Sequence, residues 1–393
     1  MGDSIHGRDL MSDRTTRRQV VQAGAGLALT ATLAGCGLGE GPSGGDTTQR
    51  ITPKVDGDLV YFNWAQYLNP SLFKEFENRH GVTVRESNFD SMPAMMAKLQ
   101  SGNHYDLIFP SAEFTHKLVG ADRLLEIPRD KLEHADVVYS YFDDPWYDPD
   151  SAHTVPYSLY VTGLGYRADK IDSMTGSWRD LTNPDAEGRS YILDDYQEGI
   201  GMANLVNGFD LNAVDPDQLE VSKEYLIGLK PDLRGFTSDT ITSMASGNAW
   251  IQHLWNGDVV NIRYRVDNPD DIQFQKCREG LPVGSDCFAI PVDAQHPGTA
   301  LLFIDFMLEK AAQNVKWTGY PMPTKNSEKA YSQLVKNDPE LVVTVHDLDI
   351  GEQYADLEGD DRKGVGSSLD GGEGGLTRCA ESRSAAARSG RRF

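Results

Sequence analysis

Two large aromatic side chains, Trp64 and Tyr67, follow a short apolar run that predicts a buried strand at 59–62. A second apolar run predicts a strand at 107–109, and Ser111 lies just beyond it. In a βαβαβ unit, the crossover connections bring such strand ends to one edge of the sheet, where ligands collect. These three residues therefore predict one wall of a binding crevice, with aromatic faces as its main chemistry. The alternative interpretation is that both aromatic side chains pack beneath the loop.

Acidic residues farther along the chain also have two interpretations. Asp195 and Glu198 have the spacing of a helix capping box, and that spacing alone favours the structural role. Asp286 fits an acid at the end of a strand, and Tyr320 fits an aromatic side chain that fills a turn. Trp255 precedes an Asn-Gly pair, which is typical of a β-hairpin.

Motifs that would indicate catalysis are missing from the sequence. Apart from a G-x-S-x-G match at 41–45, inside the Gly- and Ser-rich linker segment, the chain has no nucleophile-elbow pattern, no H-E-x-x-H zinc motif and no metal-spaced histidine pair. We therefore expect a binding protein that is not an enzyme and that holds no cofactor and no metal. A secreted lipoprotein hydrolase is the weaker alternative.

The secondary-structure elements that position the crevice can be predicted from capping signals and hydrophobic spacing. Asn69, followed by proline, predicts the start of a helix, and Gly81 predicts its end. Methionine and leucine residues at helical spacing predict a helix at 92–99, after a second strand near Val84. The β-rich run 159–166 predicts a strand that crosses between domains. Further strands are predicted at 190–193, 249–254 and 288–291.

Length and charge limit the possible functions. The chain has 393 residues, which is enough for two domains with full cores. Its 59 acidic and 37 basic residues give a formal net charge of −22. This balance argues against binding to nucleic acid or to anionic lipid. An acidic chain with little lysine resembles the proteins of halophiles, in which salt screens the self-repulsion.

The N-terminus has the features of an export signal. Arg17 and Arg18 form a twin-arginine pattern, a short apolar segment follows, and residues 33–36 read as a lipobox. We expect a twin-arginine lipoprotein signal at 1–36, a lipid group on Cys36 and a flexible linker at 37–58. The protein would then be extracytoplasmic and attached to the membrane only through this lipid. The alternative is a flexible tail with a chance arginine pair.

The remaining cysteines and the C-terminus give two further expectations. Cys277 and Cys287 flank a Gly- and Pro-containing loop in a chain predicted to be exported, so we expect a disulfide between them. The last segment, 364–393, is rich in Gly, Ser, Ala and Arg and loses hydrophobic periodicity. It is predicted to be a disordered tail.

Six motifs in order between residues 59 and 323 resemble the spermidine/putrescine-binding proteins of bacterial ABC importers. These are Tyr61–Tyr67, Tyr105–Ser111, Leu193–Asp195, Leu254–Gly257, Asp286–Pro291 and Gly319–Pro321. The resemblance implies an α/β fold of two lobes, the periplasmic-binding-protein fold, with a ligand cleft between lobes joined by crossover strands. It places the crossings near Tyr160 and Ser285. Lobe 1 would then comprise 59–160 and 286–330, and lobe 2 would comprise 161–285 and 331–363.

The resemblance also implies which residues contact the ligand. The cleft residues that match are Trp64, Tyr67, Ser111, Asp195, Glu198, Trp255, Asp286 and Tyr320. Glu113 replaces one aromatic residue of the family and Gly284 replaces another, so we expect a thinner cage with one extra acid. Carboxylates suit the ammonium groups of a polyamine, and aromatic faces suit both its charge and its methylene spacers, at about 0.5–2 kcal/mol for each cation–π contact.

The implied partners are a polyamine ligand, the permease and the ATPase subunits of an ABC transporter; no nucleic acid is expected. We expect the protein to act as a monomer. One alternative is a binding module that senses amines for a signalling receptor. Ferric ion is a rival ligand, but the sequence lacks the adjacent tyrosine pair that would favour it.

Overall fold

The computed structural model describes residues 50–355, as mixed α/β structure. The predicted signal at 1–36 with Cys36, most of the predicted linker and the predicted tail at 364–393 lie outside the described residues. The strands are β1 Leu59–Trp64, β2 Val84–Phe89, β3 Leu107–Ile108, β4 Thr154–Arg167, β5 Ser190–Ile192, β6 Leu233–Phe236, β7 Ile251–Trp255, β8 Ile272–Gln275, β9 Pro282–Ala289 and β10 Glu352–Gln353. The α-helices are α1 Pro70–His80, α2 Met92–Gln100, α3 Ala112–Gly120, α4 Tyr196–Val206, α5 Pro216–Leu229, α6 Thr240–Ala245, α7 Asn256–Arg263, α8 Pro297–Glu309, α9 Ala311–Thr318, α10 Glu328–Val335 and α11 Val345–Ile350.

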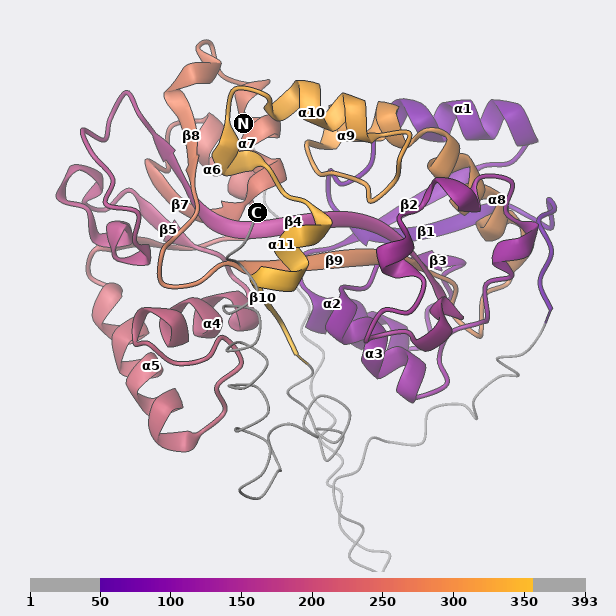
Figure 1. Cartoon of the computed structure of the whole chain (residues 1–393), viewed down its shortest axis with the longest axis horizontal. Helices are drawn as coiled ribbons and strands as arrows, with labels where there is room; N and C mark the ends of the chain where they lie inside the picture. The colour runs from indigo at the N-terminus through magenta and orange to yellow at the C-terminus, as the bar shows by residue number, and fades with distance from the viewer. Residues whose placement is uncertain (1–49, 356–393) are drawn as a thin grey trace, which may run out of the picture. The chain divides into compact units, whose positions relative to one another are not determined.

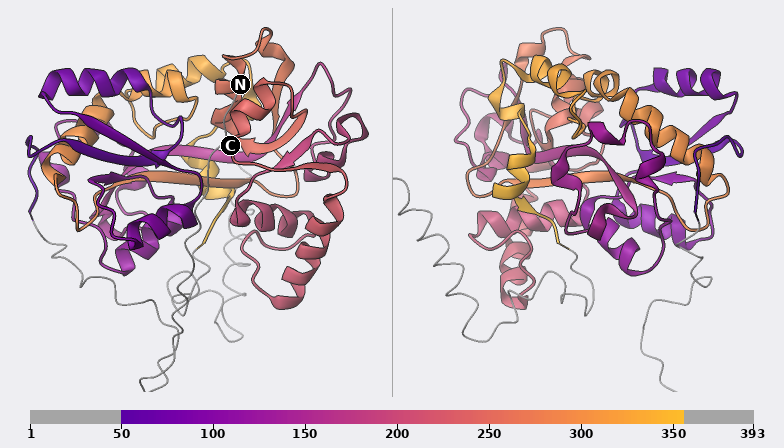
Figure 2. Two further views of the ribbon diagram at one scale, coloured as in Figure 1. Left: turned by 180° about the vertical axis from the view of Figure 1, so that it is seen from behind. Right: turned by 45° about the vertical axis from the view of Figure 1, so that its right-hand side comes forward.

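The ten strands belong to one sheet with helices on both faces (Figures 1 and 2). The order is β2-β1-β3-β9-β4-β7-β5-β6, with β8 and β10 paired to β4 and β9 off this path. Helices α1 and α8 lie on one side of β1–β3, and α2 and α3 lie on the other (Figure 1). Within residues 50–355, no helix has the length and apolar character of a membrane span.

The first βαβαβ unit forms as the sequence predicts. β1 pairs in parallel with β2 and with β3. The Asn69 side chain accepts a hydrogen bond from the Ser71 amide and caps α1, and Gly81 ends that helix at φ 68°. One expectation is corrected: β1 continues through Trp64, so this side chain stands at the end of the strand and not in a loop.

Two long strands run through both parts of the sheet. β4 pairs antiparallel with β9 over 154–161 and with β7 over 162–166. The residues at which we expected the crossings, Tyr160 and Ser285, lie within these strands. The lobe boundaries derived from them stay a prediction.

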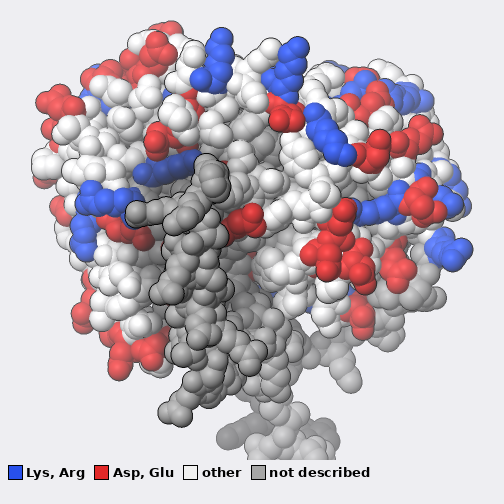
Figure 3. All heavy atoms as spheres, in the orientation of Figure 1, with Lys and Arg blue, Asp and Glu red and all other residues white. Residues whose placement is uncertain are grey.

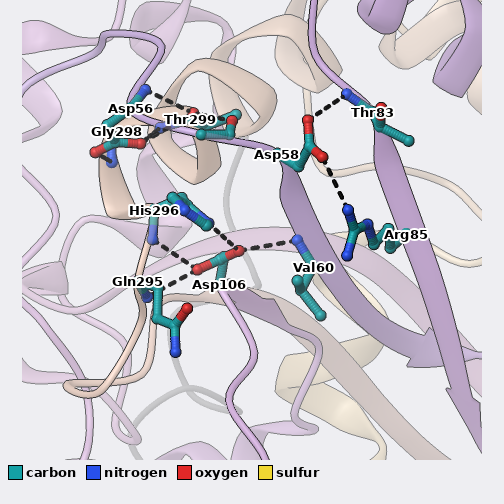
Figure 4. A network of polar contacts seen from close by, with 11 residues as sticks. Asp56, Asp58, Val60, Thr83, Arg85, Asp106, Gln295, His296, Gly298 and Thr299 are labelled. Atoms are coloured by element: carbon teal, nitrogen blue, oxygen red, sulfur yellow. Dashed lines mark hydrogen bonds and ion pairs between the residues drawn. The ribbon is translucent and has the colours of Figure 1, made fainter.

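A polar network fixes the first described segment to the body of the protein (Figure 4). Asp56 accepts hydrogen bonds from the amides of Gly298 and Thr299, both at 2.9 Å. It therefore caps α8, whose own preceding residue, His296, provides no side-chain cap. Buried Asp106 accepts from the Val60 and His296 amides at 2.9 and 2.7 Å and so links β1 to the same region.

Candidate functional site

The cavity where the strand ends meet has a volume of about 580 Å³. Its walls come from the ends of β1, β2, β6 and β7, from the interior of β4 and β9, and from the segments that begin α3, α4, α6 and α7. All nine predicted ligand-binding residues line it: Trp64, Tyr67, Ser111, Glu113, Asp195, Glu198, Trp255, Asp286 and Tyr320. The structure thus brings residues 256 positions apart in the sequence into one cavity.

Aromatic side chains form much of the cavity wall. Trp64 from β1 and Trp255 from β7 approach with ring centroids 6.0 Å apart, and the Trp64 ring also packs on Phe89. Tyr67 and Tyr320 meet edge to face at 4.9 Å. These rings offer flat apolar surface next to acidic groups, which is the environment that a methylene chain between two cationic groups requires.

Asp286 on β9 is the most enclosed of the predicted acids, with 4% of its surface exposed. Tyr67 Oη donates to its Oδ2 at 2.7 Å, and the Ser158 hydroxyl lies 3.4 Å from the same oxygen. Burial raises the pKa of Asp286 to about 7, although both hydroxyl hydrogen bonds oppose the rise. No basic side chain neutralises this carboxyl in its described surroundings.

Glu113 lies in the first turn of α3 and is also buried. Ser111 Oγ donates to its Oε1 at 2.6 Å. Burial raises the pKa of Glu113 to about 8, and the charges of Asp286 and Asp195 raise it further, against the lowering effect of the Ser111 hydrogen bond. The extra acid predicted from the sequence therefore faces the other carboxyls of the cavity.

Asp195 and Glu198 share the first turn of α4 but have different roles. Asp195 is the N-cap, and its Oδ1 accepts from the Gln197 and Glu198 amides at 2.9 and 3.2 Å. Burial and the charge of Glu198 raise the pKa of Asp195 to about 6. Its backbone amide is not bonded to Glu198, so the capping box is only half formed.

Three donors from separate segments hold the Glu198 carboxylate toward the cavity. Trp255 Nε1 and Thr162 Oγ1 donate to Oε1 at 2.9 and 3.0 Å, and Tyr354 Oη donates to Oε2 at 2.7 Å. This arrangement explains why the box is incomplete, because the side chain is used elsewhere. The hairpin interpretation of Trp255 is wrong, since α7 begins directly after it at Asn256.

Cavity residues that the sequence interpretation did not assign to the ligand include Tyr160, Asp258 and Tyr354. Asp258 lies in the first turn of α7, and it accepts from Tyr320 Oη at 2.7 Å and from Thr240 Oγ1 at 2.6 Å. Burial raises its pKa to about 6. The local signal for Asp258 was its position three residues after Trp255, at the start of a helix. Tyr160 and Tyr354 have no such signal in the sequence.

The charge of the cavity has one sign. Eight acidic and eight aromatic residues line it, and no lysine, arginine or histidine is among the described lining residues. On the face in Figure 3, acidic side chains also spread over both sides of the molecule, with lysine and arginine interspersed. No cluster of ligands suited to a metal ion occurs within residues 50–355. The cavity therefore suits an organic cation with apolar spacers.

The predicted disulfide is wrong. Cys277 and Cys287 are both free and buried in the structure. They belong to different hydrophobic clusters: Cys277 packs with Leu164 and Trp178, whereas Cys287 packs with Tyr157 and its Sγ lies 3.4 Å from Tyr147 Oη. The loop between them does not bring the thiols together, because Cys277 is buried just after β8 and Cys287 is buried within β9, in a different cluster.

Comparisons with known proteins agree with this geometry. Residues 71–343 match the family described as bacterial extracellular solute-binding protein. The spermidine/putrescine-binding periplasmic protein of Salmonella typhimurium is 30% identical over 309 residues, which cover 77% of this chain and 88% of that protein.

Two solved structures of similar proteins extend the comparison. The TpPotD lipoprotein of Treponema pallidum is 26% identical with a TM-score of 0.66, and the match covers 79% of this chain and 97% of that one. The spermidine/putrescine ABC transporter substrate-binding protein PotD of Streptococcus pneumoniae is 26% identical with a TM-score of 0.63, covering 79% and 95%. The predicted periplasmic-binding-protein fold is thus confirmed.

Proposed function

The chain belongs to the family of bacterial extracellular solute-binding proteins, and from this premise we propose that it captures a polyamine of the spermidine/putrescine class. It delivers that ligand to the permease of an ABC transporter. The names of its relatives support this assignment, since the Salmonella and Streptococcus proteins are named for spermidine and putrescine.

The single observation that carries the proposal is a set of buried carboxyls without a basic partner in the cavity. Glu113, Asp258 and Asp286 are each less than 9% exposed, and their described hydrogen-bond donors are neutral. Glu198 is also buried, but its Oε2 lies 3.6 Å from Nε2 of His253, which does not line the cavity. Removing a carboxylate from water without a counter-charge costs several kcal/mol, roughly, in a protein interior. Burial raises the pKa values of Glu113, Asp258 and Asp286, and a cationic ligand would supply a counter-charge for their ionised forms.

The aromatic residues narrow the class of cation. A metal ion needs oxygen or nitrogen ligands around one point, whereas here Trp64, Tyr67, Trp255 and Tyr320 line the cavity together with the acids. Ammonium groups joined by methylene spacers fit this combination, because the charges can meet carboxylates while the spacers pack on rings. The structure therefore favours a linear diamine or polyamine over ferric ion.

The cellular setting follows from the N-terminal sequence. Export by a twin-arginine signal and a lipid on Cys36 would keep the protein outside the cytoplasm, close to its permease. We propose that it acts there as a monomer and catalyses no reaction. The similarity to a lipoprotein of Treponema pallidum supports the anchor. The acidic composition supports a salt-rich environment.

A thermal-shift comparison of matched amines tests the proposal. Putrescine and spermidine should raise the melting temperature, because a ligand at about 100 times its Kd adds about 2.7 kcal/mol of stability. The control is 4-aminobutyrate, which has the length of putrescine but a carboxylate in place of one ammonium group. Equal shifts with this control, or none with any polyamine, would contradict the proposal.

A further inference from the structure

The Tyr160 side chain lines the bottom of the cavity, in space that a residue without a side chain on the neighbouring strand leaves free. It lies on β4 directly opposite Gly284 of β9 in the antiparallel register. A Cβ atom added at Gly284 would approach three atoms of the Tyr160 side chain, its hydroxyl oxygen among them, at less than 3.0 Å. The tyrosine ring therefore lies over Gly284 and fits there only because this residue has no side chain.

The register also shows why this space belongs to the ligand site. Gly284 and Asp286 are two residues apart on β9, so they face the same side of the sheet. Asp286 lines the cavity, and directly opposed residues of antiparallel strands share a face. Tyr160 thus reaches the bottom of the cavity from β4. It lies at the place where Gly284 replaces an aromatic residue of the resembled family.

The Tyr160 hydroxyl is surrounded by acidic groups. The nearby charges of Glu113, Asp286, Glu198 and Asp195, together with burial, raise its pKa well above the usual value. It stays a neutral hydrogen-bond donor at any physiological pH. A second tyrosine uses a glycine in the same way, because the Tyr320 ring lies against Gly257 and its hydroxyl reaches Asp258.

We propose that Tyr160 contacts the ligand and determines its specificity, and that its ring fits in the cavity because Gly284 has no side chain. The proposal rests on the polyamine function of the cleft. It goes beyond that function by naming Tyr160 as the side chain that sets the depth of the cavity. The ring provides a flat surface for the spacer between two ammonium groups that meet the four surrounding carboxyls. A short diamine depends on this central contact more than a longer polyamine, which also contacts the rest of the cavity.

Calorimetry with putrescine and spermidine tests the ligand role. Tyr160→Gly should weaken putrescine binding about tenfold and spermidine binding less, so that the ratio of their Kd values rises about fivefold. Tyr160→Phe keeps the ring and should leave that ratio nearly unchanged. The matched control is Tyr264→Gly, which removes an exposed tyrosine outside the cavity. Unchanged affinities in Tyr160→Gly would overturn the ligand role.

A double-mutant cycle in the ligand-free protein tests separately whether the Tyr160 ring requires the small residue Gly284. Gly284→Trp should lower the melting temperature because it collides with Tyr160, and Tyr160→Gly in the same chain should restore most of the loss. Equal melting temperatures for Gly284→Trp and the parent would overturn this requirement. If the parent binds no polyamine, the proposed function fails along with the ligand role. If the parent binds both amines and Tyr160→Gly changes neither, only the ligand role of Tyr160 fails.

Discussion

Asp286 and Glu113 show how individual carboxyls prepare the cleft for a cation. Both are buried, both accept hydrogen bonds from neutral donors, and burial raises their pKa values to about 7 and 8. A neutral acid in this setting is the lower-energy state until a positive charge arrives. The binding energy of an ammonium group therefore includes the ionisation of the acid that receives it.

Asp286→Asn should weaken polyamine binding roughly tenfold to a hundredfold, since a charge-assisted hydrogen bond contributes about 1.5–3 kcal/mol. The amide keeps the shape of the side chain and one acceptor oxygen for Tyr67. Stability without ligand should change little or rise, because a buried uncompensated acid is removed. Calorimetry at one fixed salt concentration measures the affinity, with exposed Asp270→Asn as the control. Parent-like affinities for both amines would remove Asp286 from the site.

The ligand-free protein should lose stability as the pH rises from 5 to 8. Carboxyls with folded-state pKa values raised above the unfolded value stabilise the fold fully at low pH, and this contribution disappears as the pH passes the raised pKa. For Asp195 and Asp258 this occurs at about 6, for Asp286 at about 7 and for Glu113 at about 8.

Melting curves of the parent and of Glu113→Gln across this pH range would check the expectation. The variant cannot ionise at this position, so its curve should fall less between pH 7 and 8 than that of the parent. Identical pH dependence in the two proteins would mean that Glu113 ionises as an ordinary exposed acid.

At the residue scale, local signals predicted the first wall of the crevice and the cap at Asp195, whereas the acids, Trp255 and Tyr320 were placed in the cleft by the family resemblance. Trp64 follows an apolar run, and Asp195 has the spacing of an N-cap. Tyr160 could not be found in this way, since its role depends on the register between β4 and β9 and on the missing side chain of Gly284. Cross-strand contacts of this kind have no signature in one segment of sequence.

At the scale of elements, helix caps were predicted best where the capping residue precedes its own helix, as Asn69 does. α8 is the contrary case, because its cap comes from Asp56, 242 residues from the Gly298 amide that it binds. The failed disulfide prediction has the same cause, because the positions of the two cysteines depend on the fold and not on their spacing in the sequence. Spacing put Cys277 and Cys287 near one loop, but the fold buries them in separate clusters.

Asp56→Ala should lower the free energy of unfolding by about 1–2 kcal/mol, the usual cost of losing an N-cap. It removes the acceptor for two amides of α8 and for the Thr299 hydroxyl (Figure 4). Urea denaturation measures the change, and exposed Asp130→Ala serves as the control. An effect no larger than that of the control would show that α8 does not depend on this segment.

At the scale of the whole molecule, the sheet joins the walls of the cavity through β4 and β9. One end of the sheet supplies Trp64 and Glu113, the other supplies Asp195 and Trp255, and Asp286 lies on a strand that connects them. The predicted fold is confirmed by the similar solved structures.

Cys36→Ser should release the mature protein from the membrane fraction, because the predicted anchor is a lipid on this cysteine. Cell fractionation followed by immunoblotting measures the distribution. Polyamine binding by the released protein should equal that of the parent, since the cleft lies in another part of the chain. A variant that stays in the membrane fraction would refute the lipid anchor.

The most direct test of the account is calorimetry of putrescine binding at pH 6.5 in two buffers that differ in ionisation enthalpy. Asp286 and Glu113, with pKa values of about 7 and 8, are then largely protonated without ligand. Binding should release about one proton or more for each putrescine, and the affinity should rise as the pH increases from 5.5 to 8. No binding of putrescine or spermidine, or binding with equal heats in the two buffers and no dependence on pH, would contradict the account.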